Sequence, residues 1–271
     1  MKALRLQKEV TVTGHDFWGR SAWITFTPAQ MPGWFWKTDE KTEPLPITLN
    51  LVSHHKNRLV LSARDKQLHI YEHIGVLRFL GIDGVIIKST SWPPYHGRAL
   101  ELWAALKTQC KESEEEIPWC TIKQSAGWPY PNTKQRRLTF IRPSRHPELN
   151  IQIVIEYPTL GRRELSVQLP RDREILLQAL GAYSQGWPLK RYAVSRLASL
   201  LGWPHHTKVT WPQEHPPERT LELFALHRLV DTLGAFSTVS NTQLLAGTII
   251  SERSGHKADL RTIQNLEILL A

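Results

Sequence analysis

Residues 69–88 read HIYEHIGVLRFLGIDGVIIK, and this stretch decides the first half of the fold. Apolar side chains recur at helical spacing from Leu68 to Leu80, and Gly81 is a residue type that commonly ends a helix. Residues 82–88 then have the apolar, β-branched composition of a strand. The stretch therefore predicts a helix that leads directly into a strand.

The rest of the chain follows the same order in each half, with strands first and helices after. The expected strands cover residues 4–13, 22–28, parts of 45–64, 136–144, 150–157, 163–169 and about 244–250. The expected helices cover residues 98–108, 171–184, 189–202, 218–235 and 257–270. Because strands and helices are segregated and do not alternate, this order predicts an α+β fold.

A polar, acidic stretch between the two halves, TQCKESEEEIP at residues 108–118, is the best candidate for a linker. It divides the chain into a unit of residues 1–112 and a unit of residues 120–271. The chain has 271 residues, which is enough for two units that each bury a core. The sequence therefore predicts two domains.

The composition excludes several classes of protein. Hydrophobic residues make up 41% of the chain and charged residues 22%, which excludes a disordered chain. No apolar run is long enough to cross a bilayer, no secretory signal is visible, and two cysteines fit a reducing compartment, so we expect a cytoplasmic protein. The net charge of +9 favours an anionic partner, which leaves nucleic acid, a phosphorylated small molecule and an acidic membrane surface open.

Two histidines and a glutamate lie together at the start of the predicted helix. On a helix, the spacing of His69 and His73 puts both imidazoles on one face, with Glu72 beside them. A metal ion that activates water uses imidazole ligands and a nearby carboxylate that accepts a proton. The motif H-x-x-E-H is typical of inverzincin peptidases, and surface or capping histidines are the alternative interpretation.

Two further motifs in the second half carry chemistry. His227 and Asp231 are four residues apart on a predicted helix, and imidazole with carboxylate is an ordinary pair of zinc ligands or a surface ion pair. His256 follows Ser254 and Gly255 at the expected start of the last helix, where an exposed imidazole could act as a general acid.

Taken in this order, the motifs resemble the UDP-3-O-acyl-N-acetylglucosamine deacetylase family, the zinc enzymes of lipid A biosynthesis. The resemblance begins with TVTGHDFWGRSAWITFTPA at 11–29 and continues through YEHIGVLRFLGIDGVII at 71–87. It ends with HRLVDTLG at 227–234 and SGHKADL at 254–260. The fold it implies has two similar βααβ subdomains, of the ribosomal-protein-S5-domain-2-like type, packed face to face with the metal site between them.

The resemblance also implies roles for individual residues. It implies that Zn²⁺ is bound by His73, His227 and Asp231, that Glu72 is the general base, and that His256 protonates the departing amine. It implies Ser184 as a hydroxyl donor beside the oxyanion. The residues it implies for a UDP-linked, N-acylated amino sugar are Tyr157 on the uracil ring and Arg228, Arg136 and Arg253 at the diphosphate. The expected protein is a monomeric hydrolase that meets an acidic membrane surface transiently and does not bind nucleic acid.

The chain also departs from the family pattern. Ala235 stands where the family has an aspartate near the catalytic histidine. In the deacetylase interpretation His69 is not a ligand, whereas a peptidase would use both His69 and His73. An alternative to both is a basic nucleic-acid-binding protein, for which the residues at 134–145 would supply a positively charged strand.

Overall fold

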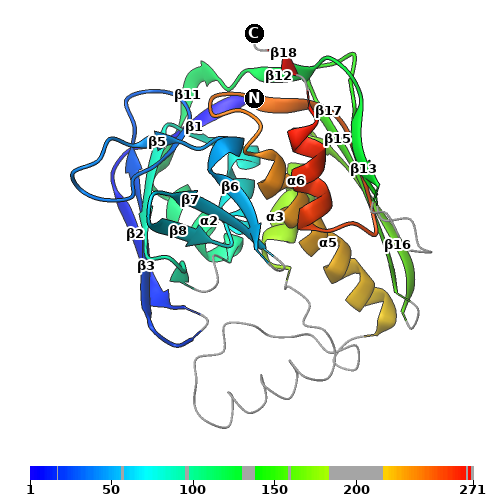
Figure 1. Ribbon diagram of the computed structural model, residues 1–271, viewed down its shortest axis with the longest axis horizontal. Coiled ribbons are helices and arrows are strands. Elements are labelled where there is room, and N and C mark those ends of the chain that lie inside the picture. Colours follow the sequence, from blue (N-terminus) through cyan, green and yellow to red (C-terminus); the bar gives the residue numbers. More distant parts are fainter. Residues whose placement is uncertain are drawn as a thin grey trace.

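The computed structural model describes residues 1–16, 18–55, 58–94, 98–129, 138–157, 160–182, 216–266 and 268–269. Within these ranges the fold is α+β, as the order of elements predicts. Figure 1 shows the helices in the middle of the molecule, with the strands of the first half on one side and those of the second half on the other. The predicted ligands His227 and Asp231 belong to one of these central helices, α5 (Pro217–Phe236).

The first half contains three sheets. A five-stranded sheet has the order β2-β3-β10-β4-β5, and a three-stranded sheet has the order β11-β1-β9. A second three-stranded sheet, β6-β7-β8, lies next to the short helix α1 (Glu72–Gly75). The strands are β1 (Lys2–Leu6), β2 (Val10–His15), β3 (Ser21–Pro28), β4 (Trp34–Trp36), β5 (Leu45–Pro46), β6 (Val52–His55), β7 (Arg58–Ala63), β8 (Lys66–His69), β9 (Ile82–Asp83), β10 (Val85–Ser89) and β11 (Cys110–Glu116).

The second half is built on one sheet of seven strands. Its path is β13-β14-β17-β12-β18, and β15 pairs in parallel with β17 and antiparallel with β16. The strands are β12 (Trp119–Ile122), β13 (Ala126–Pro129), β14 (Leu138–Arg142), β15 (Leu149–Tyr157), β16 (Gly161–Leu169), β17 (Leu244–Glu252) and β18 (Ile268–Leu269). The remaining helices are η1 (Leu49–Leu51), η2 (Val76–Leu80), α2 (Ala99–Lys107), α3 (Arg173–Leu180), α5 (Pro217–Phe236) and α6 (His256–Gln264).

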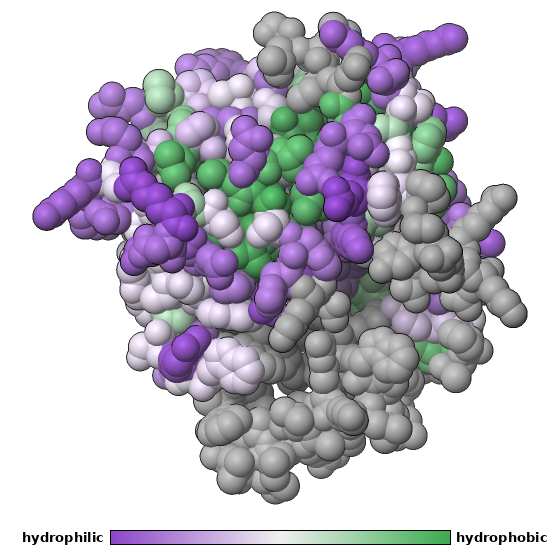
Figure 2. Space-filling model, viewed as in Figure 1, coloured by the Kyte–Doolittle hydropathy of each residue, from purple (hydrophilic) through white to green (hydrophobic). Residues whose placement is uncertain are grey.

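Burial follows the alternation and periodicity of the sequence. Ile24, Phe26 and Ile87 are inaccessible in the first-half sheet, and Ile153 and Ile249 are inaccessible in the second-half sheet. In the view of Figure 2, hydrophobic residues form a strip across the middle of one face, with hydrophilic residues on both sides of it. Among the described residues, no helix combines the length and the apolar character that a bilayer crossing requires.

Three expectations about the elements are wrong. The helix expected from Leu68 begins only at Glu72, because Ile70 has a left-handed φ of 59° that separates strand β8 from α1. The proposed linker at 108–118 contains strand β11, which pairs with β1. The last helix ends at Gln264, and Ile268–Leu269 form β18.

Two further expected strands are each divided between two sheets: residues 4–13 form β1 and β2, and residues 82–88 form β9 and β10. The remaining expected elements that the structure describes are present within a few residues of their expected bounds. The helix expected over 189–202 lies outside the described residues. The division into units of 1–112 and 120–271 stays a prediction.

Candidate metal centre

Helix α5 supplies two of the candidate ligands. His227 and Asp231 are four residues apart and therefore project from the same face of the helix, where both are buried. The helix begins with Pro217, a residue that favours the first turn, and its later turns carry buried apolar side chains such as Leu229 and Leu233. The core thus fixes the rotation of α5 and the direction of its two polar ligands.

Two glycines allow α1 to approach α5 closely. A Cβ atom on Gly234 would overlap the carbonyl group of Glu72, and one on Gly75 would overlap the hydroxyl of Ser237. The backbones of the two helices are therefore in direct contact. This contact places Glu72 and His73, at the start of α1, beside Asp231.

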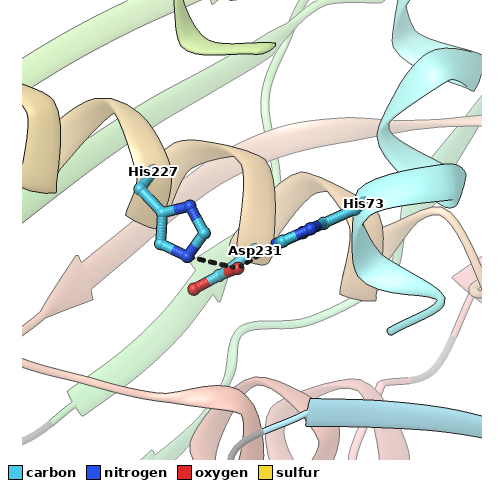
Figure 3. Close-up of side chains that lie close together, drawn as sticks. All are labelled: His73, His227 and Asp231. Atoms are coloured by element: carbon cyan, nitrogen blue, oxygen red, sulfur yellow. Dashed lines mark ion pairs between the residues drawn. The ribbon is translucent and has the colours of Figure 1, made fainter. Parts of the chain in front are cut away.

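The ligand atoms of three side chains converge. Asp231 Oδ1 lies 3.5 Å from His73 Nε2 and 3.4 Å from His227 Nε2, and all three atoms lie within 4.8 Å of one another. The two imidazole rings are nearly perpendicular, at 85°, with their centroids 5.2 Å apart. Figure 3 shows Asp231 between the two histidines, with a dashed line to each. We call His73, His227 and Asp231 the metal-ligand group.

The chemistry of this group fits a divalent cation. Asp231 Oδ1 is buried and accepts no hydrogen bond from a described residue, although two imidazole nitrogens face it. Burial lowers the pKa of His227 to about 4, so its ring is neutral and offers a lone pair. Burial alone would raise the pKa of Asp231, but the nearby imidazoles of His227, His256 and His73 hold it well below its usual range. Two imidazoles and a carboxylate form a donor set that suits zinc.

Glu72 stands next to the metal-ligand group as a buried carboxyl. Its Oε2 accepts the backbone N–H of Leu59 at 2.9 Å, and its Oε1 lies 3.9 Å from His256 Nε2. Burial raises the pKa of Glu72, although His256 and His73 oppose that shift. A carboxylate with a raised pKa and one anchored oxygen is suited to accept a proton.

His256 completes the centre from the start of α6. Its Nε2 lies 3.6 Å from Asp231 Oδ2, and its Nδ1 is buried without a hydrogen bond to any described residue. Ala235, where the resemblance implies an aspartate, is fully buried. Asp259, one turn after His256, is bonded to Arg228 and to Thr139. Asp259 therefore does not replace the missing partner.

Arg228 belongs to a buried network behind the centre. Its Nη2 donates to both oxygens of Asp259 at 2.5 Å and to Ser254 Oγ at 2.9 Å. Thr139 Oγ1 donates to Asp259 Oδ1 at 2.7 Å, and Asp259 is fully buried. The network ties α5 to both sides of His256, because Ser254 precedes it and Asp259 follows it. Arg228 is thus paired inside the protein, where we expected a cation available to a diphosphate.

Of the other residues expected to contact the substrate, the structure describes Arg253 and Tyr157. Arg253 forms an ion pair with Glu156, and Tyr157 packs edge-on against Phe224 with ring centroids 5.4 Å apart. Arg136 and Ser184 lie outside the described residues, so their predicted roles remain predictions.

The structure separates His69 from the metal-ligand group. His69 ends strand β8, and its ring stacks on Trp92 with centroids 4.5 Å apart. Because His69 and His73 do not share a helical face, the geometry that the peptidase interpretation requires is absent from these two residues. Of the basic stretch at 134–145, Thr139 and Ile141 are buried in β14.

Sequence reasoning did not identify several residues that shape this centre. Leu59 acts through its backbone N–H, which any residue type would supply. Thr139 and Arg58 carry no local motif, and Arg58 lies beside the sheet residue that anchors Glu72. Gly234, in the last turn of α5, was the one visible signal, because a glycine inside a helix can mark close packing.

A cation-binding group, a buried carboxyl and a facing imidazole form the kind of site that metal-dependent hydrolases use. The model of the UDP-3-O-acyl N-acetylglycosamine deacetylase (LpxC) family matches residues 4–179. Because the match covers more than half of the chain, the chain belongs to this family. A search of curated proteins found no match. The matched residues end before α5, so the assignment of His227, Asp231 and His256 depends on the geometry.

Proposed function

We propose that the protein is a zinc-dependent hydrolase that removes an acyl group from the nitrogen of a UDP-linked amino sugar. The observation that carries the proposal is the convergence of His73, His227 and Asp231 beside the buried carboxyl of Glu72. Family membership supports the reaction and the substrate class, UDP-3-O-acyl-N-acetylglucosamine or a close relative. We place the protein in the cytoplasm, as a monomer in lipid A biosynthesis.

The proposed architecture has two βααβ units with the metal between them. The ligands come from both halves of the chain, because His73 lies on α1 and the other two lie on α5. Figure 1 shows α5 between the sheets of the two halves. A metal at the contact between α1 and α5 would therefore link the two units.

In the proposed mechanism, the metal-ligand group would hold a zinc ion, which would supply an activated water molecule and a Lewis acid for the acyl carbonyl. Glu72 accepts the proton of the attacking water at Oε1, while the Leu59 N–H holds Oε2 in place. His256 faces Glu72 at 3.9 Å and donates a proton from Nε2 to the departing amine. The C–N bond then breaks, leaving a free amine and a carboxylate. We assign Ser184 as a hydroxyl donor to the oxyanion.

Substrate recognition is proposed to involve Tyr157 against the uracil ring, with Arg136 and Arg253 at the diphosphate. Tyr157 is partly exposed and follows Glu156, the ion-pair partner of Arg253. Tyr157 and this ion pair therefore lie at the same end of β15. The burial of Arg228 and its pairing with Asp259 support a structural role for it in place of diphosphate contact.

The test is an assay for amine release from UDP-3-O-acyl-N-acetylglucosamine by the zinc-loaded protein. Glu72→Gln and His256→Gln should each lower kcat by about 10²- to 10⁴-fold while the metal content is unchanged. His146→Gln is the matched control, because it removes an exposed imidazole that has no part in the metal centre, and it should keep its activity. A zinc-loaded protein that releases no amine from any UDP-linked N-acyl glucosamine would overturn the proposal.

A further inference from the structure

Three side chains form a stack at the start of β7, outside the metal-ligand group. The Arg58 guanidinium lies over the Trp92 ring, with its central carbon 4.4 Å from the ring centroid. The His69 ring is stacked on Trp92, and Arg58 Nε donates a hydrogen bond to His69 Nδ1 at 3.3 Å. These contacts fix the orientation of a long, otherwise mobile side chain.

The groups that hold Arg58 are neutral. Burial, together with the charge of Arg58, lowers the pKa of His69 to about 4, so its ring accepts the hydrogen bond as a neutral imidazole. Among the described residues, no carboxylate forms an ion pair with Arg58. By contrast, Asp259 neutralises Arg228 and Glu156 neutralises Arg253. His69 and Trp92 thus fix the orientation of the Arg58 guanidinium without neutralising its positive charge.

Arg58 is also close to the reaction centre. The next residue, Leu59, donates its N–H to Glu72 and accepts the N–H of Tyr71 through its carbonyl oxygen. The negative charge of Glu72 partly offsets the effect of burial, which lowers the pKa of Arg58. A partly buried, fixed guanidinium beside a catalytic carboxyl is suited to recognise an anionic group of a bound ligand.

We propose that Arg58, held on Trp92 by His69, binds a phosphate group of the molecule that occupies the metal centre. The planar guanidinium can donate two parallel hydrogen bonds to phosphate oxygens. The proposal rests on the proposed function only in taking the ligand to be a phosphorylated sugar. It replaces Arg228, which is paired internally, with Arg58 as a phosphate contact.

The test measures the binding of UDP and of uridine to the full-length zinc-loaded protein by titration calorimetry. Arg58→Gln should raise the Kd for UDP by about tenfold or more and leave uridine binding unchanged, because a charged hydrogen bond is lost. Arg58→Lys keeps the positive charge but cannot donate two parallel hydrogen bonds to one phosphate, and it should weaken UDP binding less than Arg58→Gln does. Arg64→Gln is the matched control, because Arg64 is an exposed arginine in the turn that ends β7, and it should bind UDP as the natural protein does.

A second measurement needs no variant. Phenylglyoxal modifies accessible arginines, and mass spectrometry of the natural protein should show that UDP protects Arg58 whereas uridine does not. Inorganic pyrophosphate should protect it if the phosphate alone is recognised, and UDP alone should do so if the nucleoside is also needed. Equal modification of Arg58 with and without UDP would overturn the proposal.

The two proposals fail separately. A protein in which Arg58→Gln binds UDP as tightly as the natural chain, but which still releases amine, contradicts only the role of Arg58. A protein that binds UDP through Arg58 but releases no amine contradicts only the deacetylase function.

Discussion

The metal-ligand group and the arginines around it differ in what their side chains contact. The three candidate ligands converge, because two helices bring them together at a glycine contact. Two arginines expected at the diphosphate, Arg228 and Arg253, instead form ion pairs with carboxylates of the protein. Arg228 directly follows His227 on α5, and Arg253 is three residues before His256, so residues of one motif differ in whether they face the metal centre or pair with the protein. A family motif is therefore better evidence for the reaction than for the substrate.

The largest expected effect is loss of the metal. His73→Ala or His227→Ala should remove zinc and lower deacetylation by more than about 10³-fold, because each removes a ligand of a three-ligand group. Metal content after dialysis and zinc competition with a chelator measure the effect. His69→Ala is the control and should retain the metal. Equal zinc loss in His69→Ala and His73→Ala would contradict the assignment of the ligands.

The next effect concerns the buried arginine pair. Asp259→Asn removes the nearer of the two carboxylates beside the buried Arg228 guanidinium, leaving only Asp231 at 4.0 Å, and should lower the free energy of unfolding by about 3 kcal/mol. Urea unfolding of the zinc-loaded protein measures this change. The double variant Arg228→Met with Asp259→Leu removes both charges and should recover much of the loss. If Asp259→Asn were as stable as the natural protein, the pair would not hold α5 to α6.

The helix contact beneath the ligands can be tested with matched glycines. Gly234→Ala should lower the free energy of unfolding by about 3 kcal/mol, because the new methyl group meets the fixed backbone of Glu72. Gly255→Ala is the control, since no atom lies within 4 Å of a Cβ atom at that position. Thermal unfolding of both variants separates a specific contact from a general effect of replacing glycine.

The buried imidazole of His227 predicts a pH dependence of stability in the chelated protein. Its pKa is about 4 in the folded state and near 6.5 when unfolded, so only the unfolded state gains a proton between these values. Stability should therefore fall as the pH drops from about 6.5 to 4, by at most about 1.4 kcal/mol per pH unit. Urea unfolding at pH 7.5, 6 and 5 measures the slope, and His227→Gln should reduce it.

The sequence predicts contacts between residues of one local motif, but it does not predict contacts between residues that are far apart in the chain. His227 and Asp231 share a helical face, so their spacing alone predicted their proximity. The acidic stretch at 108–118 resembles a linker in the sequence, because the basic residues that pair with its glutamates, Lys2 and Arg5, are at the other end of the first half. In the structure it pairs with β1, where Arg5 lies 2.5 Å from Glu115 and Lys2 lies 3.5 Å from Glu114.

The pairing of the arginines shows the same limit. Asp259 is 31 residues from Arg228, and Glu156 is far from Arg253 in sequence, so no local sequence pattern predicts either ion pair. The left-handed φ of Ile70 was equally hidden, because β-branched residues seldom adopt it. These features arise from packing between elements, and periodicity along one element does not report them.

The smallest expected effect comes from the exposed arginine pair. Arg253 and Glu156 keep 21% and 38% of their side-chain surface exposed, so water screens their attraction far more than that of Arg228 and Asp259. Glu156→Gln should therefore change the free energy of unfolding by less than about 1 kcal/mol. It also removes the negative charge that competes with a phosphate for Arg253. If Arg253 serves the diphosphate, UDP should bind Glu156→Gln more tightly than the natural protein, and the gain should shrink at high salt. Unchanged or weaker UDP binding, measured by titration calorimetry, would show that Arg253 is a structural residue like Arg228 and would leave Arg58 as the phosphate contact.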